Sequence, residues 1–167
     1  MGDVIKVGMA DLKTGKGTDV LTTLGLGSCI GLTFYDPTSK IGGLVHYMLP
    51  DSTKLKNNSN IAKFGDTGIR ELYNQVIAMG ASKYRLVAKI AGGAKMFEVS
   101  GLSGIGNVGD RNAEAAKKIL KELGVKEDDL AKLALDCSRN KTRSLIGYKP
   151  LAYEDILVIY QMAYERG

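Results

Sequence analysis

The chain has 167 residues, of which 44% are hydrophobic and 25% charged, so it can bury one hydrophobic core and does not resemble a disordered or fibrous protein. No run approaches the roughly 18 apolar residues of a membrane span, and the N-terminal residues lack the features of a signal peptide, so we expect a cytoplasmic location without membrane insertion. The net charge of +5 is scattered rather than gathered in a basic, aromatic-rich patch, which argues against a nucleic-acid partner.

Apolar runs interrupted by glycine, proline and aspartate predict about eight short strands. The turn signal Asp36-Pro37 makes the third and fourth of these strands a hairpin. The predicted strands cover residues 4–9, 20–24, 29–35, 41–48, 85–90, 130–135, 142–148 and 155–160.

Two further segments have apolar residues at helical spacing. The first runs from Ile61 to Ile77, and Gly80 is placed to end it in the left-handed conformation. The second begins near residues 110–112 and is stopped by Gly124. Together with the strands they predict an α+β fold in a single domain, residues 1–167, with sheets packed face to face and both helices on one side.

A glycine-rich turn between the second and third strands is the strongest candidate for a site. Gly25 and Gly27 bend the chain sharply before Cys29 and leave room for a ligand near the backbone. A cysteine at this strand end would be exposed and rigidly held, as a nucleophile needs. The amides of the turn, including that of Ser28, could point together toward an oxyanion. On composition alone, a small buried cysteine is the commoner interpretation.

His46 is the only histidine in the sequence and lies at the end of the hairpin strand that follows the cysteine. The hairpin can place His46 beside Cys29, and a cysteine nucleophile needs a neighbouring base. Thr23 ends the strand that enters the turn, so its hydroxyl is a candidate to orient the imidazole. The structural alternatives are a hydrogen-bonded core histidine and a strand threonine favoured by β propensity.

Metal and cofactor sites are disfavoured by the residue types present. Two cysteines and one histidine are too few for a structural zinc site with four ligands, and we expect no metal and no cofactor. The GxGxxG pattern at residues 104–109 does not directly follow a hydrophobic strand, as a dinucleotide fingerprint should. A disulfide between Cys29 and Cys137 is disfavoured in a reducing compartment.

Two sequence blocks that occur together, in this order and at this spacing, are highly specific: TLGLGSC at residues 23–29 and AKIAGGAKMF at residues 88–97. They are accompanied by Asp36-Pro37, the histidine seventeen positions after the cysteine, MLPD at residues 48–51, AKFGDT at residues 62–67 and GDRN at residues 109–112. By these features the chain resembles the CheD family of chemoreceptor glutamine deamidases over roughly residues 3–148.

The resemblance implies a layered α/β/β fold and a catalytic triad of Cys29, His46 and Thr23. It implies hydrolysis of selected glutamine side chains on methyl-accepting chemoreceptors, giving glutamate and ammonia. Since the family also binds the phosphatase CheC, one alternative is a non-catalytic or dual-role module that stimulates CheC, and another is a cysteine amidase with a different substrate. Phe97, in the second block, is a candidate for a substrate or partner surface.

One segment departs from the family pattern. Residues 136–140 read DCSRN where the family usually has DTGGN, so two glycines are lost and Cys137 stands in the place of a threonine. We interpret this cysteine as a neutral change, since cysteine and threonine are similar in size.

Overall fold

The computed structural model describes residues 2–55, 59–94 and 108–127, together with Glu154 and Leu157. The chain divides into two compact units, Met1–Glu127 and Asp128–Gly167, and every sheet strand and helix named below belongs to the first. The strands predicted over residues 130–135 and 142–148 lie outside the described residues, as do Phe97 and Cys137.

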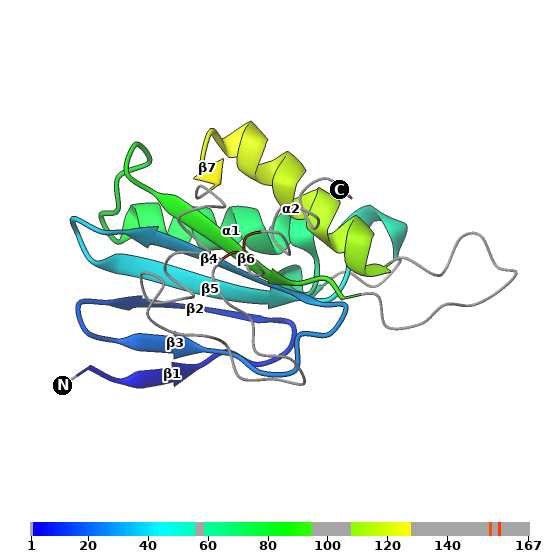
Figure 1. Cartoon of the computed structure of the whole chain (residues 1–167), viewed down its shortest axis with the longest axis horizontal. Coiled ribbons are helices and arrows are strands. Elements are labelled where there is room, and N and C mark those ends of the chain that lie inside the picture. Colours follow the sequence, from blue (N-terminus) through cyan, green and yellow to red (C-terminus); the bar gives the residue numbers. More distant parts are fainter. Residues whose placement is uncertain (1, 56–58, 95–107, 128–153, 155–156, 158–167) are drawn as a thin grey trace, which may run out of the picture. The chain divides into compact units, whose positions relative to one another are not determined.

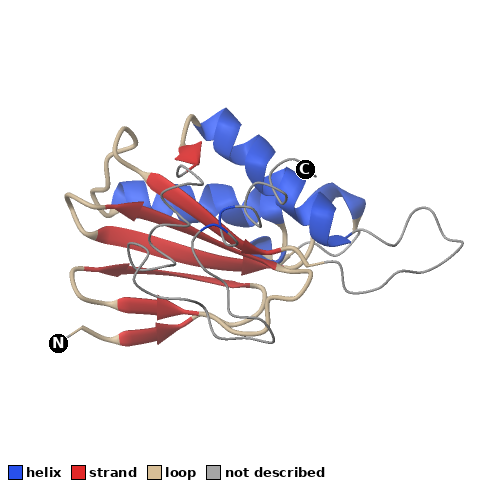
Figure 2. Ribbon diagram, viewed as in Figure 1, coloured by secondary structure: helices blue, strands red, loops and turns tan. Residues whose placement is uncertain are grey.

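The first unit combines short strands with two main helices, which confirms the predicted α+β class (Figures 1 and 2). Five strands form one sheet in the order β2-β5-β4-β6-β7, antiparallel except for the last pair, and β1 and β3 form a parallel pair. The strands are β1 (Val4–Lys6), β2 (Asp11–Lys16), β3 (Val20–Thr22), β4 (Ile30–Asp36), β5 (Ile41–Tyr47), β6 (Val87–Gly92) and β7 (Lys126–Glu127).

The two main helices are α1 (Gly65–Ala78) and α2 (Val108–Leu123), and two short 3-10 helices, η1 (Ser52–Lys54) and η2 (Ile61–Lys63), precede α1. The main helices end where predicted, because Gly80 and Gly124 both have positive φ, at 108° and 67°. Helix α2 begins slightly earlier than expected. Among the described residues, no helix is long and apolar enough to cross a membrane.

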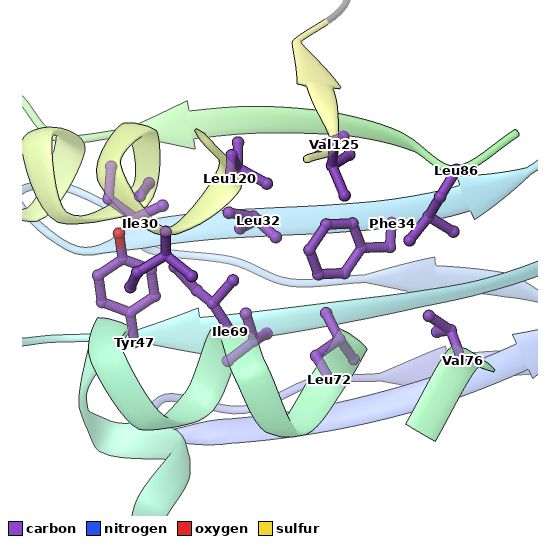
Figure 3. Close-up of a cluster of buried hydrophobic side chains, with 14 of the residues drawn as sticks. Ile30, Leu32, Phe34, Tyr47, Ile69, Leu72, Val76, Leu86, Leu120 and Val125 are labelled. Carbon is purple, nitrogen blue, oxygen red and sulfur yellow. The ribbon is translucent and has the colours of Figure 1, made fainter. Parts of the chain in front are cut away.

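Both helices pack on the same face of the five-stranded sheet. Successive side chains of a strand point to opposite faces, so every second residue of β4 and β5 enters the core between sheet and helices. Figure 3 shows this layer, with α1 and α2 supplying apolar side chains to a shared cluster. Its most buried members include Ile30, Leu32, Phe34, Val45, Tyr47, Ile69, Leu72, Val76, Ala116 and Leu120.

The turn end of the β4–β5 hairpin is fixed by a buried carboxylate. Asp36 is fully buried, and its Oδ2 accepts hydrogen bonds from the Ser82 amide at 2.9 Å and from Arg85 Nη2 at 2.8 Å. The Arg85 guanidinium holds the pKa of this carboxyl well below its usual range, so the ion pair persists at neutral pH. The turn end is thereby tied to the segment that leads into β6.

Two sequence predictions need correction. The strand β2 was not predicted, because its sequence DLKTGK has a single large apolar residue and no strand-like alternation. It forms a strand because its backbone pairs with β5. The strand predicted over residues 155–160 is wrong at Leu157, which is helical, as is the nearby Glu154. A short apolar run does not distinguish a buried strand from a helix.

The close contact between β5 and α1 makes Gly43 a sensitive position. A Cβ atom there would lie 2.6 Å from Leu72 Cδ1 and 3.0 Å from Val76 Cγ1, and both side chains are fully buried. Gly43→Ala should therefore lower the free energy of unfolding by about 1–3 kcal/mol, the usual cost of overpacking a core, as measured by urea denaturation. Gly8→Ala is the control, since a Cβ at Gly8 meets nothing within 4 Å. Equal stability of the two variants would contradict this account of the packing.

Candidate active site

The candidate nucleophile lies at the end of a seven-residue segment, residues 23–29, that joins β3 to β4. The chain turns through Gly25 and Gly27, whose φ angles of 71° and 47° lie in the left-handed region. Cys29 is partly buried, and its amide donates a hydrogen bond to the Leu26 carbonyl at 2.6 Å. Burial raises the pKa of the Cys29 thiol, because it penalises the thiolate.

The two residues that follow β6 hold this turn through backbone hydrogen bonds. The amide of Gly93 donates to the Cys29 carbonyl at 2.9 Å, and the amide of Ala94 donates to the Gly27 carbonyl at 2.8 Å. Gly92, with a φ of 101°, lies so close that a Cβ there would be 2.2 Å from the Cys29 carbonyl oxygen. The glycine pair of the AGGA segment is thus needed for the approach of one backbone to another.

His46 lies on the sheet face opposite the helices. It pairs with Gly31 of β4 in the antiparallel register, and only 1% of its surface is exposed. Because Gly31 has no side chain, the side chains of Leu26 and Thr23 fill the space above it. A Cβ atom at Gly31 would lie 3.1 Å from Leu26 Cδ2 and 3.6 Å from Thr23 Cγ2. Burial among these groups lowers the pKa of His46, since it penalises the imidazolium.

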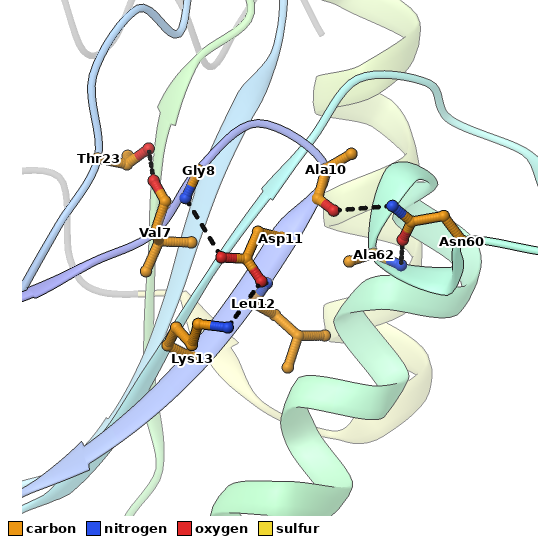
Figure 4. Close-up of polar contacts among 9 residues, drawn as sticks. All are labelled: Val7, Gly8, Ala10, Asp11, Leu12, Lys13, Thr23, Asn60 and Ala62. Carbon is orange, nitrogen blue, oxygen red and sulfur yellow. Dashed lines mark hydrogen bonds and ion pairs between the residues drawn. The ribbon is translucent and has the colours of Figure 1, made fainter.

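Thr23 contacts the imidazole of His46. Its Oγ1 lies 2.9 Å from His46 Nδ1. The same hydroxyl donates to the Val7 carbonyl at 2.8 Å, as Figure 4 shows. A hydroxyl has one proton, and the carbonyl can only accept, so Oγ1 must accept from the ring. The proton of neutral His46 is therefore on Nδ1, which leaves a lone pair on Nε2.

Cys29 and His46 lie at the same end of the sheet, but Cys29 makes no hydrogen bond to His46 Nε2. Cys29 precedes Gly31 by two residues, so it is diagonal to His46, a relation that usually separates Cα atoms by about 7–8 Å. Nε2 is buried and has no hydrogen-bond partner within the part of the chain that the structure describes. Catalytic hydrogen bonds are often long in unliganded enzymes and shorten when substrate binds.

The hydrogen bonds of the turn reduce the number of backbone amides that are candidates to bind an oxyanion. The amide of Cys29 is occupied by the Leu26 carbonyl, so it cannot also hold an oxyanion without breaking that bond. The amides of Gly25, Gly27 and Ser28 remain the candidates in the turn. Val7 was missed by the sequence reasoning, since it acts through a backbone carbonyl that no side-chain pattern reveals.

Taken together, burial favours the neutral forms of both side chains. The thiol holds its proton to higher pH than a free cysteine, and the imidazole stays neutral to lower pH than a free histidine. The resting forms at neutral pH are therefore the thiol of Cys29 and the neutral imidazole of His46.

Sequence comparisons show which known proteins the chain is similar to. A family model described as CheD chemotactic sensory transduction matches residues 48–147. A protein of Lachnoclostridium phytofermentans is 57% identical over 75% of this chain and 78% of its own length. Relatives from Caldanaerobacter subterraneus and Pyrococcus horikoshii are 51% and 42% identical, over 73% and 83% of this chain and 75% and 90% of their own lengths. Each is named "Probable chemoreceptor glutamine deamidase CheD".

The tautomer of His46 can be tested directly, because a single histidine gives an imidazole 15N spectrum without overlap. We expect the proton of the neutral ring on Nδ1 in the native protein and in Thr23→Ser, which keeps the hydroxyl. Thr23→Val keeps the shape but removes the acceptor, so the proton should shift toward Nε2. Identical ring spectra for the valine and serine variants would show that the hydroxyl does not set the tautomer.

The protonation of the pair predicts how Cys29 alkylation depends on pH. The rate of its reaction with iodoacetamide, followed on the Cys29 peptide by mass spectrometry, should rise with an apparent pKa above that of a free cysteine. NMR titration should give His46 a pKa below that of a free histidine. An alkylation rate that is already at its plateau in mildly acidic solution would instead indicate a resting thiolate–imidazolium pair.

Proposed function

As a member of the CheD family, this chain is a chemoreceptor glutamine deamidase, and we propose that Cys29, His46 and Thr23 carry out its reaction. In the first step the Cys29 sulfur attacks the carboxamide carbon of a receptor glutamine, and its proton passes to His46 Nε2. The carbonyl oxygen becomes an oxyanion, and we assign its stabilisation to the candidate amides of Gly25, Gly27 and Ser28.

In the second half of the reaction His46 acts first as a general acid and then as a general base. His46 returns the proton to the leaving nitrogen, so that ammonia departs and a thioester to Cys29 remains. A water molecule then gives a proton to Nε2 and attacks the thioester, which releases glutamate and restores the thiol. One water is consumed and one ammonia formed for each glutamine.

The observation that carries the proposal is the pair of hydrogen bonds made by the Thr23 hydroxyl. Since Val7 takes its proton, Thr23 can only accept from Nδ1, and the basic nitrogen of His46 is the one that is free of partners among the described residues. This is the arrangement that a general base for a thiol requires. A histidine that served only the core would be expected to have both ring nitrogens satisfied.

The proposed substrates are the cytoplasmic parts of methyl-accepting chemoreceptors, where a new carboxylate changes the receptor charge and creates a methylation site. Binding of the phosphatase CheC is compatible with this reaction, and we propose it as a second role. The two roles can be separated, because a variant without the nucleophile should lose deamidation and keep any effect on CheC. A cysteine amidase with another substrate would release ammonia from other glutamine compounds but not from receptor fragments.

Ammonia release from purified receptor fragments tests the mechanism. Cys29→Ala should abolish it, since the turn has no other nucleophile, and His46→Ala should lower the rate at least about 100-fold, the usual contribution of a positioned acid–base group. Thr23→Ala should cost less, because this residue orients the ring and transfers no proton. Cys137→Ser is the matched control and should keep nearly full activity under reducing conditions. Activity of Cys29→Ala near that of the native enzyme would falsify the mechanism.

A further inference from the structure

Asn112, in the first turns of α2, makes an unusual set of contacts for a residue outside the triad. It is fully buried, and its side-chain Nδ2 donates to two backbone carbonyls, those of Ser28 and Met48, both at 2.9 Å. Its own backbone carbonyl accepts a hydrogen bond from the Tyr47 hydroxyl at 2.6 Å. These partners lie next to the nucleophile and next to His46, far from Asn112 in the sequence.

The contact with Ser28 fixes the peptide that precedes the nucleophile. In a trans peptide the carbonyl and the following N–H point in opposite directions. Asn112 holds the Ser28 carbonyl on one side, while the Cys29 N–H bonds the Leu26 carbonyl on the other. This peptide plane therefore cannot rotate without breaking two hydrogen bonds, and it sets the direction in which the Cys29 side chain leaves the backbone.

The contacts with Met48 and Tyr47 tie the same side chain to the histidine strand. Tyr47 is the last residue of β5 and directly follows His46, and Met48 comes next. The two hydrogens of one amide group thus bridge the nucleophile turn and the end of β5. An aspartate would present no donor to either carbonyl when ionised, and alanine would leave both carbonyls without this partner.

The start of helix α2 can approach the Cys29 turn closely because Gly109 has no side chain. A Cβ at Gly109 would lie 2.5 Å from the Gly93 carbonyl oxygen and 2.8 Å from that of Ala94. The AGGA segment in turn bonds the carbonyls of Gly27 and Cys29. Three successive carbonyls, of residues 27, 28 and 29, are thereby each held by a donor from another element.

We propose that Asn112 is a positioning residue for deamidation, which holds the Cys29 turn and the His46 strand at their working separation. The inference rests on the proposed roles of Cys29 and His46. It assigns to the asparagine no contact with substrate and no proton transfer. Its loss should therefore slow the chemical step while substrate binding is kept.

The test compares Asn112→Ala with Gly43→Ala, which disturbs the core where β5 packs against Leu72 and Val76 of α1. For each variant we would measure kcat and KM on receptor fragments, the Tm, and amide hydrogen exchange by NMR. Asn112→Ala should lower kcat by about 10- to 100-fold, the effect expected of a displacement near 1 Å, with KM nearly unchanged. Exchange of the Cys29, Gly93 and Ala94 amides should accelerate, while the amides in the middle of the β4–β5 ladder stay protected.

Gly43→Ala should keep most of its kcat despite a similar loss of Tm, which separates positioning from general destabilisation. If Asn112→Ala does not fold, Tyr47→Phe decides, since it removes only the hydroxyl that bonds the Asn112 carbonyl, and it should lower kcat several-fold at constant KM. A native kcat in Asn112→Ala would overturn the inference, and so would a native kcat in Tyr47→Phe if Asn112→Ala does not fold. A fall of kcat in Gly43→Ala as large as that in Asn112→Ala would also overturn it. Failure of the proposed mechanism itself would be recognised separately, by activity in Cys29→Ala.

Discussion

The pairing of β4 with β5 is the constraint on which the rest of the structure depends. Its register sets Gly31 opposite His46, and by alternation it sends Ile30 and Tyr47 into the core beneath the helices. A slip of one residue would exchange the two faces, burying the imidazole under α1 and exposing the apolar side chains. The same ladder that buries the core therefore places the histidine at the end of the sheet where Cys29 precedes β4. One set of backbone hydrogen bonds thus specifies both the core and the candidate site.

The environment of His46 follows from this placement. The ring lies on the face away from the helices, where Leu26 and Thr23 cover it only because Gly31 leaves the space. Burial makes the imidazole a weaker base and the nearby thiol a weaker acid, so it opposes a resting ion pair. The hydroxyl of Thr23 compensates by fixing the tautomer, which needs no charge. In the proposed mechanism, a neutral and correctly oriented His46 would accept the thiol proton at the moment of attack, and the resting enzyme would hold no thiolate that reacts with oxidants in the absence of substrate.

Much of this arrangement could be predicted from the sequence, and the residues concerned explain why. The hairpin, the turn at Gly25 and Gly27 and the helix ends are local features, written within a few residues of one another. Thr23 was predicted as the orienting group, largely through the resemblance to a family. The strand β2 was missed because its order comes from pairing with β5 rather than from its own composition. The contact of Asn112 with Ser28 spans 84 positions and ends on a carbonyl oxygen, which every residue possesses, so no residue type marks it.

These contacts explain why glycine is required at particular positions near the site. At the level of sequence, 21 glycines indicate many turns. At the site, Gly92 and Gly109 serve to bring backbones together: a Cβ at either would lie within 2.5 Å of a carbonyl oxygen of another segment. The Cys29 turn is held by donors from the two residues after β6 and from α2, and such donors reach it only where side chains do not intervene. A rigid cysteine turn that is held by backbone hydrogen bonds thus requires glycine within the turn and also on the segments that approach it. This requirement accounts for the glycines of the AGGA segment and for the glycine in the first turn of α2.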